Sequence, residues 1–288
     1  MAKGEKLQLA DVLTDYWVGS QLGTGARIVI HEVKRKADGK VFAAKFVSVS
    51  TEEDLRVTTH LENEFKVLTA LHAHKGEALP IIIRPVAFKK IKQLFKVRAA
   101  YIIMERAAGR SLFDYGEYSI AQVLTIFRQV CLALEHMHSV GYVHADLKPQ
   151  NILVDGNLKV KLIDFGFAAK IGQKLTAYKG TFGYLAPEQA GGRLSEKTDV
   201  YNLGAALYRV LTGENMPSIM PGRTEARGFV ADEKINIASL SRINPDVPEE
   251  LSQVVIKCIS PSEHERPSVT QLKRYLHGLQ LRLDYGAV

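Results

Sequence analysis

Three polar side chains lie within six residues of one another near the middle of the chain, and a fourth follows soon after. They are Asp146, Lys148 and Asn151, and then Asp164. Carboxylate and amide oxygens are the ligands that a hard cation such as Mg²⁺ prefers. A carboxylate can also accept a proton, and a lysine can neutralise a phosphate as a point charge. These residue types suit chemistry on a phosphate group, whereas an isolated Asp146 would ordinarily be a surface-loop or capping carboxylate.

The order of several short motifs gives these residues a context. Residues 143–151 read Val-His-Ala-Asp-Leu-Lys-Pro-Gln-Asn, and they are followed by Asp-Phe-Gly at 164–166 and Ala-Pro-Glu at 186–188. The apolar stretch at 41–45 reads Val-Phe-Ala-Ala-Lys. In this order and at these separations the motifs resemble those of the eukaryotic-type protein kinase family, and specifically its serine/threonine branch. The resemblance covers residues 16–278.

This resemblance implies transfer of the γ-phosphate of ATP to a hydroxyl group, with Mg²⁺ bound. Asp146 would accept or orient the proton of the attacking hydroxyl, and Lys148 would reach the γ-phosphate. Asn151 and Asp164 would hold the metal ion. Catalysis of this kind consists of positioning and charge neutralisation, because the transferring phosphate is crowded with negative charge.

Lys45 ends the apolar stretch at 41–45, where an amine needs a partner. The resemblance implies that Lys45 holds the α- and β-phosphates and pairs with a glutamate of the helix that follows. Glu64 is the preferred partner, since the residues after it fit the family pattern. Glu62 is the alternative, because the register of a helix is hard to establish from sequence.

Residues 22–30 read Leu-Gly-Thr-Gly-Ala-Arg-Ile-Val-Ile and match the nucleotide loop of the family. Leu22, Gly23 and Gly25 would contact the nucleotide, although a plain hairpin turn is the alternative. Ile28 stands where the family has a third glycine, which predicts a stiffer or differently seated lid over the phosphates. The resemblance also assigns the adenine pocket, whose members could otherwise be simple core residues: Ile30, Ala43, Met104, Glu105, Ala107 and Leu153.

Ala145 replaces the arginine that the family usually has before the catalytic aspartate. That arginine normally meets a phosphate on the activation segment and orders it. We therefore expect activity that does not require phosphorylation of Thr176 or Tyr178, although Lys170 or Lys179 could substitute as cations.

Thr181 belongs to Gly-Thr-Phe-Gly-Tyr-Leu at 180–185, which in the family precedes the Ala-Pro-Glu motif. The resemblance implies that Thr181 braces Asp146 and Lys148, as in serine/threonine kinases. Lys148-Pro149 also matches this branch.

Further polar residues are expected to support the site without doing chemistry. Glu188 would form a buried ion pair with Arg266, and Asp199 would support the backbone of the catalytic loop. His144 would pack under Phe165. Loss of one partner of such a buried pair should cost about 3–5 kcal/mol.

The elements that must position these residues can be predicted from periodicity. Residues 16–49 look like short strands, 51–71 like a helix, and 99–104 like a strand. A helix should then present an apolar stripe formed by Leu124, Phe127, Cys131, Leu134 and Met137. Later helices are predicted around 196–212, 249–259 and 268–280.

The predicted fold class is α+β, with two lobes as in protein kinases: a small β-rich N-lobe with one main helix and a larger α-rich C-lobe. The predicted divisions are a lead-in at 1–15, the N-lobe at 16–104, a hinge at 105–109, the C-lobe at 110–278 and a tail at 279–288.

Composition excludes several classes of protein. The chain has 288 residues, of which 46% are hydrophobic and 24% charged, so disordered and fibrous classes are excluded. Two cysteines, Cys131 and Cys258, cannot form a disulfide framework or a cysteine-rich zinc site. Without a signal peptide or a long apolar segment, we expect a cytoplasmic protein. The family resemblance implies that its substrate is a protein.

The net charge of +7 is concentrated in the first part of the chain. Between Arg84 and Arg98 the sequence holds several lysines and no acidic residue. This stretch could bind nucleic acid, an anionic membrane or an acidic partner. The favoured interpretation is a solvated β-hairpin whose lysines discourage edge pairing, and nucleic acid is not an expected partner because aromatic residues are sparse there.

Three functions are compatible with these features. An active serine/threonine protein kinase is favoured because Lys45, Asp146, Asn151 and Asp164 are all present. A pseudokinase or scaffold has only Ile28 and Ala145 in its favour. A small-molecule phosphotransferase of related fold is less consistent with the motifs at 180–188.

Overall fold

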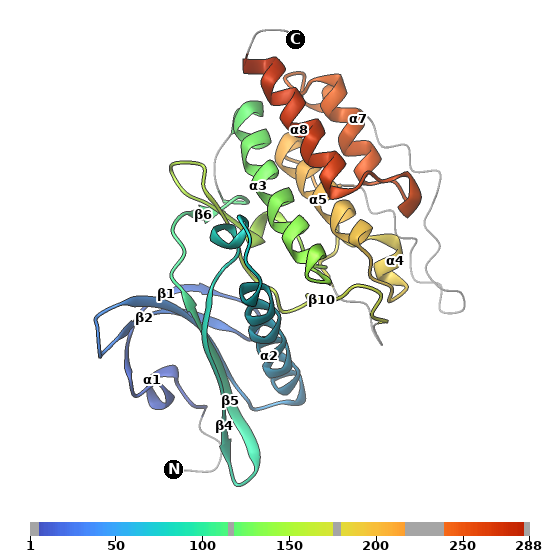
Figure 1. Cartoon of the computed structure of the whole chain (residues 1–288). Helices are drawn as coiled ribbons and strands as arrows, with labels where there is room; N and C mark the ends of the chain where they lie inside the picture. Colours follow the sequence, from blue (N-terminus) through green and yellow to red (C-terminus); the bar gives the residue numbers. More distant parts are fainter. Residues whose placement is uncertain (1–5, 115–117, 175–179, 217–238, 285–288) are drawn as a thin grey trace. The chain divides into compact units, whose positions relative to one another are not determined.

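The computed structural model describes residues 6–114, 118–174, 180–216 and 239–284. The chain divides into two compact units (Figure 1). Unit 1 comprises Met1–Ala73 and Ile83–Ala107, and unit 2 comprises His74–Ile82 and Ala108–Val288. Unit 1 thus ends inside the segment predicted as a hinge. A β-rich first unit and a helical second unit confirm the predicted α+β class.

Unit 1 is built on a five-stranded antiparallel sheet with the strand order β1-β2-β3-β5-β4. Its elements are α1 (Leu9–Val12), β1 (Tyr16–Thr24), β2 (Val29–Arg35), β3 (Val41–Ser48), α2 (Glu52–Ala73), β4 (Pro85–Gln93) and β5 (Lys96–Glu105). The strands and the long helix lie where periodicity predicts them. The short helix α1 was not predicted, because four residues are too few to show a helical period.

One face of the sheet carries a hydrophobic cluster that includes residues of the predicted lead-in. Leu9 and Leu13, each 3% exposed, pack with Val33, Ala44 and Ile103 of the sheet. Residues 9–13 therefore contribute to the core of unit 1.

Helix α2 begins with a capping arrangement. The Asp54 carboxylate accepts hydrogen bonds from the backbone N–H groups of Ser50 (3.0 Å) and Thr51 (2.9 Å), and the Thr51 hydroxyl accepts from the Asp54 N–H (3.2 Å). These bonds satisfy N–H groups at the helix start that have no partner within the helix. These bonds thereby fix the start of α2 relative to the short segment that connects it to β3.

Unit 2 is mainly helical, with short strands near the loops that carry the motifs. Its elements are η1 (Leu79–Ile81), β6 (Arg110–Ser111), α3 (Ile120–Ser139), β7 (Tyr142–Val143), η2 (Pro149–Asn151), β8 (Ile152–Val154), β9 (Val160–Leu162), β10 (Ala169–Lys170), α4 (Pro187–Ala190), α5 (Glu196–Thr212), α6 (Leu240–Ile243), α7 (Glu249–Cys258), η3 (Glu263–Glu265) and α8 (Val269–Asp284). The three later helices confirm the predicted positions to within a few residues.

Helix α3 is the centre of the unit 2 core. All five residues of its predicted apolar stripe, including Cys131, are fully buried. Ser119 caps the helix: its hydroxyl accepts from the Gln122 N–H (3.3 Å), and its own N–H donates to the Gln122 side chain (2.9 Å). Helices α5 and α8 pack against α3, and α3 and α5 also contact β7, the strand that leads into the loop with the motifs.

Two glycines allow close backbone approaches in unit 2. A Cβ atom on Gly204 of α5 would lie 2.6 Å from the Cβ of Cys258 in α7, so only glycine lets these helices meet. Gly109, at the end of the predicted hinge, has φ +95°, and a Cβ there would lie 2.4 Å from the carbonyl oxygen of Val154. Of the described helices, none is both long enough and apolar enough to cross a membrane.

Candidate functional site

The loop between β7 and η2 in unit 2 carries the predicted catalytic aspartate. Thr181 donates a hydrogen bond from its hydroxyl to Asp146 Oδ1 (2.7 Å) and accepts one from Lys148 Nζ (2.7 Å). Lys148 Nζ also lies 3.0 Å from Asp146 Oδ2. The structure therefore brings together the three residues that the sequence grouped. Asp146 is only 4% exposed, so its carboxylate is held by these contacts and little by water.

Asn151 is tied to the same aspartate from the other side. Its amide nitrogen donates to the carbonyl oxygen of Asp146 (2.8 Å) and more weakly to Asp146 Oδ2 (3.3 Å). The amide oxygen is thus the atom that could ligate a cation. The backbone carbonyl of Asn151 accepts a hydrogen bond from the N–H of Ile163 (3.0 Å). Asp164 is the next residue along the chain, so this bond brings the backbone of Asp164 close to that of Asn151. Asp164 has φ +65°, in the left-handed region.

The donor set can be tested against the metal ion that the motifs imply. The described residues contain no group of three or more His, Cys, Asp or Glu side chains that could hold a metal ion. A cation between Asn151 and Asp164 would have two protein oxygens and would complete its shell with water or phosphate oxygens. Mg²⁺ is usually bound in this way, through one or two carboxylates and the phosphates of a substrate. The residues therefore fit Mg²⁺ and do not fit a closed zinc site.

Asp199 supports the backbone of the loop that carries Asp146, as predicted. Its fully buried carboxylate accepts from the backbone N–H groups of His144 (3.0 Å) and Ala145 (2.9 Å). It also lies 2.8 Å from His138 Nε2 at the end of α3, a contact that was not predicted. Ala145 has φ +60°, which costs a residue with a Cβ about 1–2 kcal/mol. The two hydrogen bonds to Asp199 offset that cost and hold Asp146 in place.

The His144 ring packs against Phe165, with ring centroids 4.8 Å apart, which confirms the predicted packing role. Complete burial lowers the pKa of the His144 imidazole below its ordinary value. The nearby carboxylates of Asp199, Asp146 and Asp164 act in the opposite direction without overcoming burial. His144 is therefore held as a neutral ring beside three acidic side chains.

Glu188 and Arg266 form the predicted buried ion pair. Arg266 donates from Nη1 and Nη2 to the two carboxylate oxygens, at 2.8 and 2.9 Å, and both side chains are almost completely buried. The Thr198 hydroxyl also donates to Glu188 (2.9 Å), and the Arg266 guanidinium lies 4.9 Å from the ring centroid of Tyr201. This fully partnered network connects α4, α5 and the segment before α8.

In unit 1, Lys45 pairs with Glu64. Lys45 Nζ lies 2.8 and 2.9 Å from the two carboxylate oxygens of Glu64, and both residues are buried. Glu62, the alternative, instead bonds Lys90 (2.6 Å) and Lys66 (3.0 Å). The preferred partner is confirmed, and β3 and α2 are joined by a buried charged pair.

Strand register places the predicted nucleotide residues of unit 1 on one face of the sheet. Ile30 is opposite Lys45, and Ala43 is opposite Met104. Directly paired residues share a face, and alternate residues along a strand do so too. These four side chains therefore lie on the face opposite the hydrophobic cluster of α1. Gly23 is opposite Ile30 on the neighbouring strand.

The remaining predicted nucleotide residues are placed as follows. Leu22 is in β1, and the Gly25 N–H donates to the Ile28 carbonyl (2.8 Å), closing the turn between β1 and β2. Glu105 ends β5 and accepts from the Arg84 N–H through its carboxylate (3.0 Å). Ala107 is buried, and its carbonyl oxygen accepts a hydrogen bond from the Arg106 side chain. Leu153, in unit 2, is a half-buried residue of β8.

Sequence reasoning missed one contact of the nucleotide loop. Arg27 Nη1 lies 2.7 Å from Asp54 Oδ1 and 3.2 Å from the Thr51 hydroxyl. The Arg27 guanidinium, by its hydrogen bond, holds the pKa of the Asp54 carboxyl well below its usual range. The loop that carries Ile28 is thus tied to the start of α2. No local pattern could reveal this contact, because it joins residues of two separate elements.

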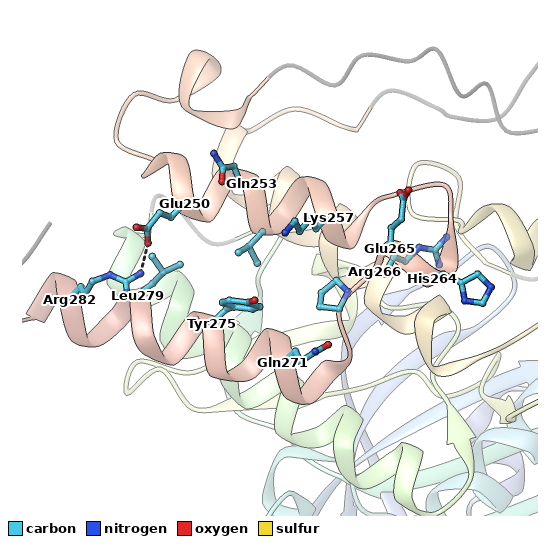
Figure 2. A pocket seen from close by; sticks show the side chains of 12 residues that line it. Glu250, Gln253, Lys257, His264, Glu265, Arg266, Gln271, Tyr275, Leu279 and Arg282 are labelled. Carbon is cyan, nitrogen blue, oxygen red and sulfur yellow. Dashed lines mark hydrogen bonds and ion pairs between the residues drawn. The ribbon is translucent and has the colours of Figure 1, made fainter.

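A pocket of unit 2 lies between α7 and α8 and has a volume of about 540 Å³. Figure 2 shows that the lining side chains come from both helices, among them Tyr275 on α8 and Lys257 on α7. Of the predicted residues only Arg266 lines it, at the end near His264. Apart from Arg266, the pocket is therefore distinct from the residues that the motifs predict.

Three residues of the regulatory prediction, Thr176, Tyr178 and Lys179, lie outside the described residues. Lys170 is exposed on β10, where it pairs with Tyr142.

The family model described as protein kinase domain matches residues 16–276. The chain is 31% identical over 219 residues to the serine/threonine-protein kinase PEPKR2 of Arabidopsis thaliana, covering 73% of this chain and 42% of the relative. It is 34% identical over 211 residues to the human cAMP-dependent protein kinase catalytic subunit PRKX, covering 70% and 54%.

A bacterial relative is also similar. Over 177 residues the chain is 32% identical to the serine/threonine-protein kinase PrkC of Bacillus subtilis, covering 58% of this chain and 26% of the relative. The chain thus spans between about a quarter and about half of the length of these relatives.

Proposed function

Because this chain belongs to the protein kinase domain family, we propose that it is a serine/threonine protein kinase that uses ATP and Mg²⁺. The observation that carries this proposal is the contact of Thr181 with both Asp146 (2.7 Å) and Lys148 (2.7 Å). This contact holds a carboxylate and a lysine side by side, and the proposal is that they act on a hydroxyl group and a phosphate group, respectively. The names of the curated relatives support the choice of serine and threonine as acceptors.

The reaction forms a bond between the acceptor hydroxyl oxygen and the γ-phosphorus. It breaks the bond between that phosphorus and the oxygen bridging to the β-phosphate, and ADP leaves. Asp146 orients the hydroxyl and accepts its proton as the bond forms. Lys148 neutralises charge on the γ-phosphate, and Thr181 holds the lysine beside the aspartate through its hydrogen bonds to both.

The remaining predicted residues bind the nucleotide and its metal. Asn151 and Asp164 would hold Mg²⁺ through their side-chain oxygens, and a metal ion there supplies charge neutralisation of the phosphates. Lys45 would contact the α- and β-phosphates, with Glu64 fixing the position of its amine. Ile28 keeps the backbone of the nucleotide loop farther from a phosphate than the glycine usual in the family would, because glycine has no side chain.

We also propose that activity does not require phosphorylation of the activation segment. Ala145 offers no cation to a phosphate at the position before Asp146, and its N–H is bonded to Asp199. Replacement of Thr176 by Ala and of Tyr178 by Phe should each leave the rate of phosphate transfer within about threefold of the native rate. Loss of activity in either variant, with the melting temperature unchanged, would show that the idea is wrong.

The test of the main proposal is transfer of labelled γ-phosphate from ATP to a basic protein substrate, with and without Mg²⁺. Asp146→Asn should lower the rate about 10²- to 10⁴-fold, because it removes the proton acceptor. The side chain keeps its size, so the fold should not change. Asp246→Asn, at an exposed turn, is the matched control and should leave the rate unchanged. The label should be on serine or threonine.

Two results would count against the proposal. ATP binding without transfer, in a folded native chain, would favour a pseudokinase and make Ile28 and Ala145 marks of lost chemistry. Transfer that persists in Asp146→Asn would remove the aspartate from its proposed role.

A further inference from the structure

The connection between β4 and β5 has an unusual composition for its backbone. Gln93 pairs with Lys96, so the connection consists of Leu94 and Phe95 alone. Their φ angles are +47° and +66°, the combination of a type I′ turn, where asparagine and glycine are strongly preferred. Leu94 is 87% exposed and Phe95 is 99% exposed. Two apolar side chains thus occupy a strained turn and contact almost nothing within the chain.

The strands that lead to this turn are basic. No acidic residue occurs between Arg84 and Arg98, and Lys89, Lys92 and Lys96 are exposed. Lys90 is different, because it bonds Glu62 of α2 (2.6 Å). β4 is an edge strand of the sheet, so lysines on it discourage pairing with another chain. That role accounts for the lysines, but it does not account for an apolar tip in left-handed backbone conformations.

The shape of the tip narrows the choice of partner. In Figure 1 the closed end of the β4–β5 hairpin projects beyond the other strands of its sheet. A projecting tip of two side chains cannot supply the roughly 800 Å² per partner that a stable protein interface needs. It can enter the boundary between lipid head groups and acyl chains, where apolar side chains are buried and nearby lysines meet phosphates. Nucleic acid would use the lysines but would gain little from Leu94.

We propose that this hairpin tip, Leu94-Phe95 with Lys89, Lys92 and Lys96, binds the surface of an anionic lipid membrane. Leu94 and Phe95 enter the interface, and the three lysines lie at the level of the head groups. Each lysine near such a surface contributes about fivefold to affinity, and salt screens that part. Binding through this tip is reversible and does not involve the residues that carry the proposed kinase function.

The experiment measures co-sedimentation of the whole 288-residue chain with vesicles of phosphatidylcholine containing about 30% phosphatidylserine, and with phosphatidylcholine alone. Leu94→Asn/Phe95→Gly removes the apolar tip and supplies the residues that the turn prefers. Its binding should fall at least about tenfold. Its melting temperature should stay the same or rise, because the backbone strain is relieved.

Two charge variants complete the design. Lys92→Gln/Lys96→Gln should weaken binding about 25-fold, as expected for the loss of two lysines. Lys36→Gln/Lys40→Gln changes the net charge equally and is the control. These two lysines are exposed near the connection of β2 and β3. That connection leads into the first residue of β3, whereas the last residues of β3 lie beside the start of β5 and therefore near the β4–β5 tip. Because the control lysines are remote from the tip, their replacement should change binding less than about twofold.

Binding of the native chain to anionic vesicles that is reduced by raised salt and by the tip variant supports the proposal. Absence of binding to anionic vesicles at low salt would overturn it. Undiminished binding of Leu94→Asn/Phe95→Gly to the vesicles would overturn it too. So would an oligonucleotide that displaces the native chain from the vesicles and that binds the native chain and the tip variant equally well. None of these measurements requires ATP, so the result is independent of the proposed kinase activity.

Discussion

The two units position their polar residues by different means. In unit 1 the Lys45–Glu64 pair joins two regular elements, the strand β3 and the helix α2. Backbone hydrogen bonds of the sheet and helix set where these side chains lie. In unit 2 Asp146 is in a loop, next to an alanine with φ +60°, and the carboxylate of Asp199 holds that loop.

This difference has a consequence for the effect of mutations. Where regular elements supply the geometry, loss of a polar contact should affect the chemistry more than the fold. Where a loop depends on buried polar side chains, their loss should affect the fold itself. Three measurements can break or sharpen this comparison.

The largest effect is expected for the ion pair of unit 2. Arg266→Met should lower the free energy of unfolding by about 3–5 kcal/mol, because it leaves the carboxylate of Glu188 buried without its guanidinium. The double variant Arg266→Met/Glu188→Leu should recover much of the loss, since no buried charge remains. Denaturant unfolding measures both. A single-variant loss below about 1 kcal/mol would mean that the network is not what stabilises unit 2.

A smaller effect, mainly on activity, is expected for the pair of unit 1. Glu64→Gln removes a charge-assisted hydrogen bond worth about 1.5–3 kcal/mol, so kcat/KM for phosphate transfer should fall roughly ten- to hundredfold. Stability should fall by no more than about 1.5–3 kcal/mol, less than for Arg266→Met, because the amide oxygen can still accept from Lys45. Glu62→Gln is the matched control and should leave kcat/KM near the native value. Unfolding of Glu64→Gln on the scale expected for Arg266→Met would erase the contrast between the units.

The smallest effect concerns pH. The native pKa of His144 is lowered, mainly by burial, so the unfolded chain binds a proton at this residue more readily than the folded chain does. The stability due to the neutral ring is complete above the unfolded pKa of about 6.5 and is lost as pH falls below it toward the native pKa. Between pH ~7 and pH ~5.5 this loss can be at most about 1 kcal/mol, the limit set by protonation of the unfolded chain.

His144→Gln cannot titrate at this position, so its free energy of unfolding should depend less on pH, by up to that limit. Comparison of urea unfolding at the two pH values measures the difference. Equal pH dependence in the variant and the native chain would mean that His144 binds protons equally in both states.

Much of the fold and several contacts followed from the sequence. Period-2 and period-3.6 patterns predicted β3, α2 and α3, since an apolar face must be buried wherever it occurs. The order of the motifs predicted the contacts of Thr181 with Asp146 and of Glu188 with Arg266. These patterns are local, or are carried by short motifs, so each can be recognised without knowing where the rest of the chain lies.

Other features were decided only by the tertiary structure. The burial of Leu9, the contact of Arg27 with Asp54 and that of His138 with Asp199 join elements whose approach no local pattern encodes. The exposed tip at Leu94 belongs to the same class, because an apolar pair in a sequence is ordinarily buried. The sequence by itself determined which residue types alternate and which motifs follow one another. Packing of the helices and strands then decided which distant side chains meet, since that depends on the register and burial of every element between them.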